Sequence, residues 1–183
     1  VQLLLEKGAE LEARDTAGMT PLMFAAQFSS TPEIVQLLLE KGAEVNARNT
    51  DGVTPLMIAA AASSTPEIVA LLIEKGAELE AKSTAGGTPL MIAAQFSSTP
   101  GIVQLLIEKG AEVNARSTDG WTPLMLAAGN SSTPEIVQLL IEKGAELEAR
   151  STAGSTPLMI AARNTNGKSA EIKQLLIDAG ATE

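Results

Sequence analysis

Residues 20–42 read TPLMFAAQFSSTPEIVQLLLEKG, and the same pattern returns along the whole chain. Each step between successive copies of Thr-Pro-Leu-Met is 34 residues, and the copies begin at Thr20, Thr54, Thr88, Thr122 and Thr156. A fixed period of this length is typical of a solenoid, in which each unit buries its apolar face only against its neighbours. The period therefore predicts one continuous stack of repeats.

Each repeat is predicted to hold two short helices. Thr20 is the expected N-cap of the first helix, with Pro21 at its first position. A turn at residues 27–30 then leads to the same signal in residues 31–33, where a carboxylate in the first turn suits the helix dipole. Gly42 is placed to end the second helix, as a glycine after the last helical residue does.

Residues 43–53 separate one helix pair from the next. They are too polar and too few for a third helix, and Asp51-Gly52 is a strong turn signal between extended flanks. We therefore expect a β-hairpin-like finger to project from each helix pair.

The succession Asp-Gly-x-Thr-Pro-Leu-x-x-Ala-Ala, Glu-Ile-Val-x-Leu-Leu and Gly-Ala-x-Val-Asn-Ala resembles the ankyrin repeat over essentially the whole chain. The resemblance implies an all-α repeat solenoid of helix-turn-helix units with projecting β-hairpin fingers. The turn between the helices departs from the family, because Ser-Ser-Thr-Pro replaces its Gly-His turn and is one residue longer. The other departure is a methionine where the family usually has the histidine that helps order the hairpin; it concerns Met23, Met57, Met91, Met125 and Met159.

We interpret residues 1–183 as a single ankyrin-type domain. It comprises a partial repeat at 1–8, full repeats at 9–42, 43–76, 77–110 and 111–144, and a C-terminal capping repeat at 145–183. The last repeat has a longer inter-helix turn at 163–169, and Lys173 replaces the valine of the other repeats. At the other end the apolar helix at residues 1–5 lacks its partner helix, so we expect this face to pack against earlier repeats or another molecule. A monomer is otherwise expected.

The repeats also alternate in pairs, so that the copying unit is 68 residues long. Leu-Glu and Val-Asn take turns at one position, as Leu11-Glu12, Val45-Asn46, Leu79-Glu80, Val113-Asn114 and Leu147-Glu148. This pattern favours recent tandem duplication, with consensus design as the alternative.

The composition argues against several functions. A net charge of −9 repels phosphate backbones and anionic lipids, so no nucleic-acid partner is expected and a basic or neutral protein fits better. No apolar run is long enough to span a membrane. With no His, Cys or Tyr, most nucleophilic and acid–base devices are missing, so neither an enzyme nor a cofactor is expected.

Carboxylate pairs such as Glu10 with Glu12 and Glu78 with Glu80 recur along the chain. They have the composition of a calcium or acid–base site, or of a solvated face. The solvated face is favoured, because catalytic sites are not usually copied several times along one chain.

One position varies more than any other, the one directly before each Thr-Pro-Leu-Met. It holds Met19, Val53, Gly87, Trp121 and Ser155, and in ankyrin-like proteins this part of the finger contacts the target. We interpret Trp121, the only tryptophan, as a binding anchor at an exposed tip, since tryptophan is enriched among residues that dominate binding. The alternative is that Trp121 lies over the neighbouring finger.

The end of the first helix also varies, and in ankyrin-like proteins it lines the concave groove. Phe28 and Phe96 are expected to plug the enlarged turn between the helices, with a role as groove anchors as the alternative. The polar residues there are the better surface candidates. The predicted partner-binding set is thus Met19, Val53, Trp121, Ser155, Gln27, Gln95, Asn130, Asp51 and Asp119.

These features favour a protein-interaction scaffold that binds a protein or peptide on the concave face of fingers and first helices. A structural or designed stack without an evolved ligand is the alternative, because the repeats are so alike. Any enzymatic activity would reside outside this chain.

Overall fold

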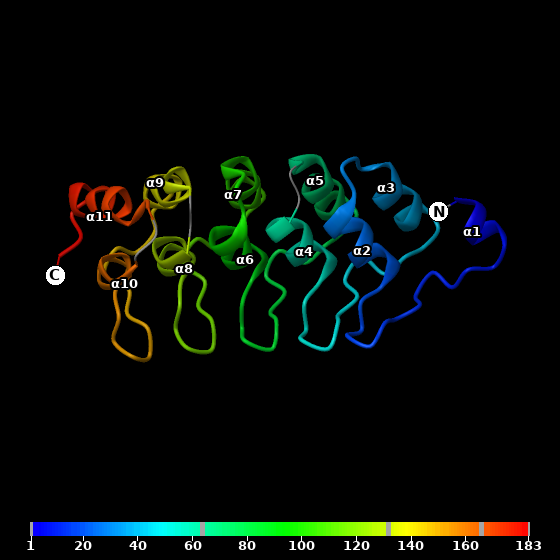
Figure 1. The fold of residues 1–183 in the computed structure, drawn as a ribbon, viewed down its shortest axis with the longest axis horizontal. Helices are drawn as coiled ribbons and strands as arrows, with labels where there is room; N and C mark the ends of the chain where they lie inside the picture. The colour runs from blue at the N-terminus through cyan, green and yellow to red at the C-terminus, as the bar shows by residue number, and fades with distance from the viewer. Residues whose placement is uncertain (1, 63–64, 131–132, 165–166, 183) are drawn as a thin grey trace.

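The computed structural model describes residues 2–62, 65–130, 133–164 and 167–182, apart from the side chains of Leu4 and Leu5. Most of the predicted N-terminal apolar face and part of the 163–169 turn therefore lie outside the described residues. Of that face, Leu3 is described and is exposed. The chain forms an elongated stack with its termini at opposite ends (Figure 1). The described residues include eleven helices and no strand.

The helices form two parallel layers, with the fingers projecting beyond the first layer (Figure 1). The first layer holds the helices that begin in Thr-Pro-Leu-Met, which are α2 (Pro21–Phe28), α4 (Pro55–Ala62), α6 (Pro89–Phe96), α8 (Pro123–Asn130) and α10 (Pro157–Arg163). The second layer holds α3 (Glu33–Glu40), α5 (Pro66–Glu74), α7 (Pro100–Glu108), α9 (Pro134–Glu142) and α11 (Ser169–Asp178), and the short α1 (Gln2–Glu6) precedes the first finger.

The predicted caps of the first helices are confirmed. The Thr88 hydroxyl accepts a hydrogen bond from Met91 N–H at 3.4 Å, and Thr20 accepts one from Met23 N–H at 3.3 Å. In α2 the Met23 sulfur in turn receives the Thr20 N–H at 3.5 Å. The methionine that replaces the family's histidine thus takes part in the cap of its own helix.

The second helices follow the prediction in part. Thr65, Thr99 and Thr133 are the N-caps of α5, α7 and α9, each with proline next, although none of them makes a side-chain capping bond. The helix α3 differs. The N-cap of α3 is Pro32, with no side-chain capping bond, so Thr31 is not its N-cap. The hydroxyl of Thr31 instead bonds to Glu33 and lowers the pKa of that carboxyl. The expected turn at residues 27–30 is also shorter, because α2 continues through Phe28. The predicted glycine stop is confirmed at Gly42, which has a φ of +97°.

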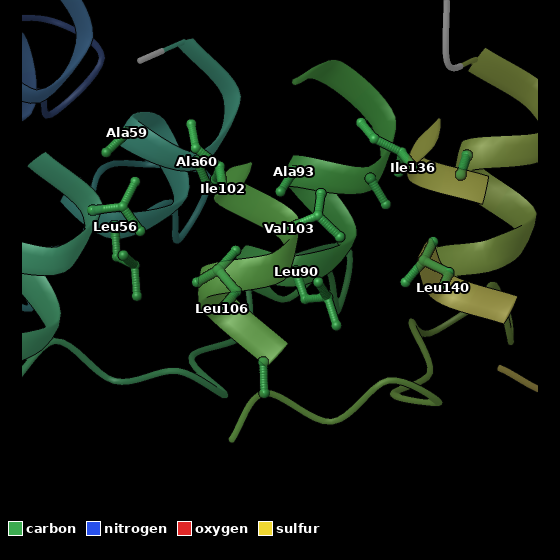
Figure 2. Close-up of a cluster of buried hydrophobic side chains, with 14 of the residues drawn as sticks. Leu56, Ala59, Ala60, Leu90, Ala93, Ile102, Val103, Leu106, Ile136 and Leu140 are labelled. Atoms are coloured by element: carbon green, nitrogen blue, oxygen red, sulfur yellow. The ribbon is translucent and has the colours of Figure 1, made fainter. Parts of the chain in front are cut away.

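One core runs through the described part of the stack from Leu22 to Ala181. The helices α5, α7 and α9 each contribute an isoleucine, a valine and a leucine, as Ile102, Val103 and Leu106 do in α7, all with no exposed surface. The paired alanines of the first layer, such as Ala59 and Ala60, are equally buried and lie where α4 meets α6 (Figure 2). Small side chains at this contact let the backbones approach closely, which suits a core poor in aromatic residues.

The fingers are not β-hairpins in the sense of paired strands. Each is a loop closed by a turn, in which Asn49 N–H donates to Val53 O at 3.1 Å and Gly52 N–H donates to Asn49 O at 3.0 Å. The Asn49 side chain accepts the N–H groups of Asp51 and Val53 at 3.0 and 2.8 Å. A side chain therefore satisfies the backbone groups that a longer strand ladder would otherwise pair.

Candidate functional site

The fingers are held to one another through their backbones. Thr84 N–H donates to Asp51 O at 2.9 Å, and Thr152 N–H donates to Asp119 O at 2.9 Å. These bonds use only the backbone carbonyls of Asp51 and Asp119. The side chains of both residues are exposed at the surface. Alanine stands at the same position in the other fingers, as Ala17, Ala85 and Ala153.

The variable position before Thr-Pro-Leu-Met is not the tip of the finger. The Trp121 carbonyl accepts Ser117 N–H at 3.0 Å, and Trp121 N–H donates to the Ser117 hydroxyl at 3.1 Å, so this residue lies where the finger returns to its helix. All five residues at this position are half-buried. Trp121 is therefore not at the exposed tip that was expected. Met19, Val53, Gly87 and Trp121 line cavities between the fingers and the first helices.

Gly87 and Trp121 border a cavity of about 300 Å³. It opens between two successive fingers and the exposed sides of α6 and α8. The predicted residues Gln95, Asn130 and Asp119 lie on its wall, which is made of Ser83, Ala85, Gly87, Met91, Ile92, Gln95, Ser117, Asp119, Trp121, Leu126 and Asn130. The structure thus brings together four residues of the predicted binding set.

A second cavity, of about 330 Å³, lies one repeat nearer the N-terminus. The predicted residues Met19, Val53 and Gln27 border it, and Ile92 belongs to both cavities. Its wall is formed by Met19, Gln27, Asn49, Val53, Met57, Ile58, Ala61, Ala62, Ile92 and Phe96. Ser155 lines neither of the two cavities, so the structure does not group it with the other predicted residues.

Phe28 and Phe96 face solvent. Their exposed fractions are 72% and 60%, so the expectation that they plug the turn between the helices is wrong. The helix extends to include them and turns them away from the core, because Ala25 and Ala26 already fill the buried side of α2. Phe28 also stacks on Phe24, with 6.3 Å between the ring centroids.

An apolar column runs along the exposed side of the first layer. Its members are exposed or half-buried and occupy one position of each repeat, as Phe24, Ile58, Ile92, Leu126 and Ile160. Together with the residues before Thr-Pro-Leu-Met and the C-terminal residues of α2, α4, α6 and α8, this column forms what we call the finger–helix surface. Sequence reasoning missed this column, although its spacing of 34 residues was visible.

The recurring carboxylates hold neighbouring repeats together. Glu12 accepts the N–H of Glu44 at 2.9 Å, and Glu80 accepts the N–H of Glu112 at 2.9 Å. Asn46 takes the same place with two bonds, accepting Glu78 N–H at 2.9 Å and donating to Gly76 O at 3.0 Å. The Leu-Glu and Val-Asn repeats therefore bond to the next repeat at the same place with different side chains, either a glutamate or an asparagine. Glu12 and Glu80 are thus not simply part of a solvated face.

Partial burial raises the pKa of the Glu80 carboxyl, and the hydrogen bond from Glu112 N–H opposes that shift. The nearby Glu112 carboxylate raises the pKa further, and Lys82 lowers it. This environment belongs to an inter-repeat contact. Among the described residues, no three His, Cys, Asp or Glu side chains are grouped so that they would hold a metal ion.

The family model described as ankyrin repeats (3 copies) matches residues 1–83, 26–117 and 90–182. The chain therefore belongs to the ankyrin-repeat family. Ankyrin repeats are generally protein-interaction modules, and proteins built from them are typically scaffolds without enzymatic activity. A comparison with curated proteins found no match. None of the helices in the described ranges has the length and apolarity needed to cross a membrane.

Proposed function

We propose that the chain is a protein-interaction scaffold whose partner, a protein or peptide, binds the finger–helix surface. The observation that carries the proposal is the exposure of Phe28 and Phe96, whose rings project from the ends of α2 and α6. Exposed aromatic rings beside apolar cavities are a common feature of protein-binding surfaces. The half-buried Trp121 extends this apolar area toward the C-terminus.

The exposed side of the second layer is more polar than the finger–helix surface, which supports the choice of the latter. Most of its exposed residues are polar or charged, such as Gln36 and Glu40, which bond to each other on α3 at 2.8 Å. Ile34 is a large apolar residue there with 38% exposure, which makes it a matched control for Phe96.

The test is quantitative affinity capture followed by mass spectrometry, with four forms of the chain. These are the unchanged chain, Phe96→Ala, Trp121→Ala and the control Ile34→Ala. A partner that depends on Phe96 and Trp121, and not on Ile34, supports the proposal. Partners that are retained equally by all four forms would count against this surface, provided that circular dichroism shows the same helix content in each.

A structural stack without an evolved ligand is the second candidate. The close identity of the repeats favours it, because a mature binding surface normally diverges from repeat to repeat, and the fingers already satisfy one another through their backbones. In that case no captured protein will distinguish Phe96→Ala from Ile34→Ala.

A further inference from the structure

We propose that the two cavities of the finger–helix surface are adjacent subsites for one extended segment of a partner protein. This segment carries two apolar side chains at positions i and i+3, with a lysine or arginine directly beside the one that enters the subsite lined by Asp119. The inference rests on the proposed function, because it names the chemistry of the partner that the same surface takes.

Gly87 lies on the wall of the first subsite and leaves it open beside Trp121. Every other repeat places a side chain at this position, whereas the cavity of about 300 Å³ has a glycine there. A Cβ atom at Gly87 would lie 3.3 Å from the Ser83 hydroxyl oxygen and 3.7 Å from Ile92 Cδ1. The indole of Trp121 and the side chain of Leu126 also line this cavity, so an apolar side chain fits it.

The second subsite has a small residue, Ala62, on its wall. Phe28 and Phe96 hold the equivalent position in the repeats before and after, and Phe96 lines this cavity together with Ala61 and Ala62. Its volume of about 330 Å³, like that of the first, lies near the lower end of the roughly 300–1,000 Å³ of ligand pockets. Each cavity therefore has room for a large side chain but not for a folded domain.

The distance between the subsites sets the spacing in the ligand. The cavities meet at Ile92, and their first-layer helices α4, α6 and α8 pack in sequence. Packed helices lie about 8–10 Å apart, so the subsites are separated by roughly that distance. A polyproline II segment rises about 3.1 Å per residue with three residues per turn, so its residues i and i+3 point the same way about 9 Å apart. In a β-strand, i and i+2 are only about 7 Å apart and i+4 is about 13 Å away.

The negative charge of the surface favours a lysine or arginine in the ligand. Asp119 is exposed on the wall of the first cavity, and its backbone carbonyl, not its side chain, holds the next finger. Neither cavity has a lysine or arginine on its wall, and the net charge of the chain is −9. A basic side chain of the ligand thus meets a carboxylate on a cavity wall that carries no lysine or arginine.

The probes are synthetic proline-rich peptides with leucine at i and i+3 and arginine at i+4. Comparison peptides move the second leucine to i+2 or i+4, or replace the arginine with glutamate. Trp121 is the only tryptophan, so its fluorescence reports directly on occupation of the first subsite. The i, i+3 peptide with arginine is expected to bind about tenfold more tightly than the peptides with altered spacing, because each of those loses the burial of one leucine.

Three variants test the subsites with residues that the chain already uses at equivalent positions. Gly87→Val copies Val53 and Ala62→Phe copies Phe28, and each is expected to weaken binding about tenfold by filling one cavity. Asp119→Ala copies Ala85 and is expected to remove the preference for arginine over glutamate, an effect of up to about fivefold. Ser155→Val, at the same repeat position as Gly87 but away from both cavities, serves as the matched control.

Binding that is indifferent to leucine spacing, or that persists in both Gly87→Val and Ala62→Phe, overturns the inference. So does the absence of binding by every peptide, even when a captured protein partner depends on Phe96 and Trp121. That last result would leave the proposed function standing and would show that the partner is not an extended segment of this kind.

Discussion

Gly87 and Trp121 occupy the same position of two successive repeats and line one cavity of about 300 Å³. The missing side chain of one thus leaves open space beside the indole of the other. In a stack whose repeats are otherwise so similar, this pair makes one part of the surface unlike the rest.

Filling that space will change the environment of Trp121 without any ligand. Gly87→Val is expected to lower the quenching of Trp121 fluorescence by acrylamide, because a side chain at position 87 will cover part of the indole. The free energy of unfolding is expected to change by only about 0.5 kcal/mol, as for other surface substitutions. Ser155→Val is the control, and equal quenching in both variants would contradict the geometry of the cavity.

Thr88 tests the caps of the first helices. Its hydroxyl is buried and accepts the Met91 N–H at 3.4 Å. Thr88→Val keeps the shape but removes the acceptor, and we expect it to lower the free energy of unfolding by about 1 kcal/mol. Urea denaturation will measure the change. Ser98→Ala, at an exposed position, is expected to have little effect, and an equal loss in both would argue against the cap.

Replacing either of two glycines with alanine is expected to change the stability of the chain, in opposite directions. Gly86 has a φ of +75°, and a Cβ atom there would lie 2.6 Å from Thr118 N in the next finger. Gly86→Ala should therefore destabilise the chain by about 1–3 kcal/mol. Gly101 lies in α7, is exposed, and would place its Cβ atom 3.8 Å from Pro66 Cγ.

Because a helical glycine is less favourable than alanine, Gly101→Ala should stabilise the chain by up to about 1 kcal/mol. Thermal unfolding followed by circular dichroism measures both variants. A lower melting temperature for Gly101→Ala, or an unchanged one for Gly86→Ala, would show that these backbone positions are described incorrectly.

Glu80→Asn tests the contact between repeats and its dependence on pH. The variant copies Asn46 and is expected to add a hydrogen bond to the Gly110 carbonyl, raising the free energy of unfolding by about 0.5 kcal/mol at neutral pH. The pKa of Glu80 is raised above its usual value of 4.5, so the folded state holds this proton more firmly than the unfolded state. The contribution of Glu80 to stability therefore falls as pH rises through the interval above 4.5.

The advantage of Glu80→Asn should consequently grow across that interval and become constant above it. Well below pH 4.5 Glu80 is protonated in both states, and the difference should no longer depend on pH. Denaturation of both proteins over this range is the measurement. An advantage that shrinks as pH rises would show that burial does not govern this carboxyl.

The sequence predicted most of the local structure. Thr20 and Pro21 mark the start of α2, Gly42 marks the end of α3 and Asp51-Gly52 marks a turn, and the structure confirms all of these. Each signal acts within a few residues, through a backbone hydrogen bond or a restricted φ angle, so it can be read from a short segment. The 34-residue period then placed these segments in a stack.

The predictions that proved wrong concern how side chains pack once the chain is folded. Phe28 was expected to cover a turn, Glu12 to be solvated and Trp121 to be at a tip. In each case the outcome depends on what already occupies the neighbouring space.

By itself, therefore, the sequence determined the helices, their order and the membership of the ankyrin-repeat family, because local capping and a regular apolar pattern specify them. Only the tertiary structure decided that Gly87 leaves a cavity beside Trp121, that Phe96 borders a second one and that Glu80 bonds to the next repeat. The physical reason is that cavities and inter-repeat bonds arise between residues about one repeat apart, and the distances between those residues depend on how the repeats pack.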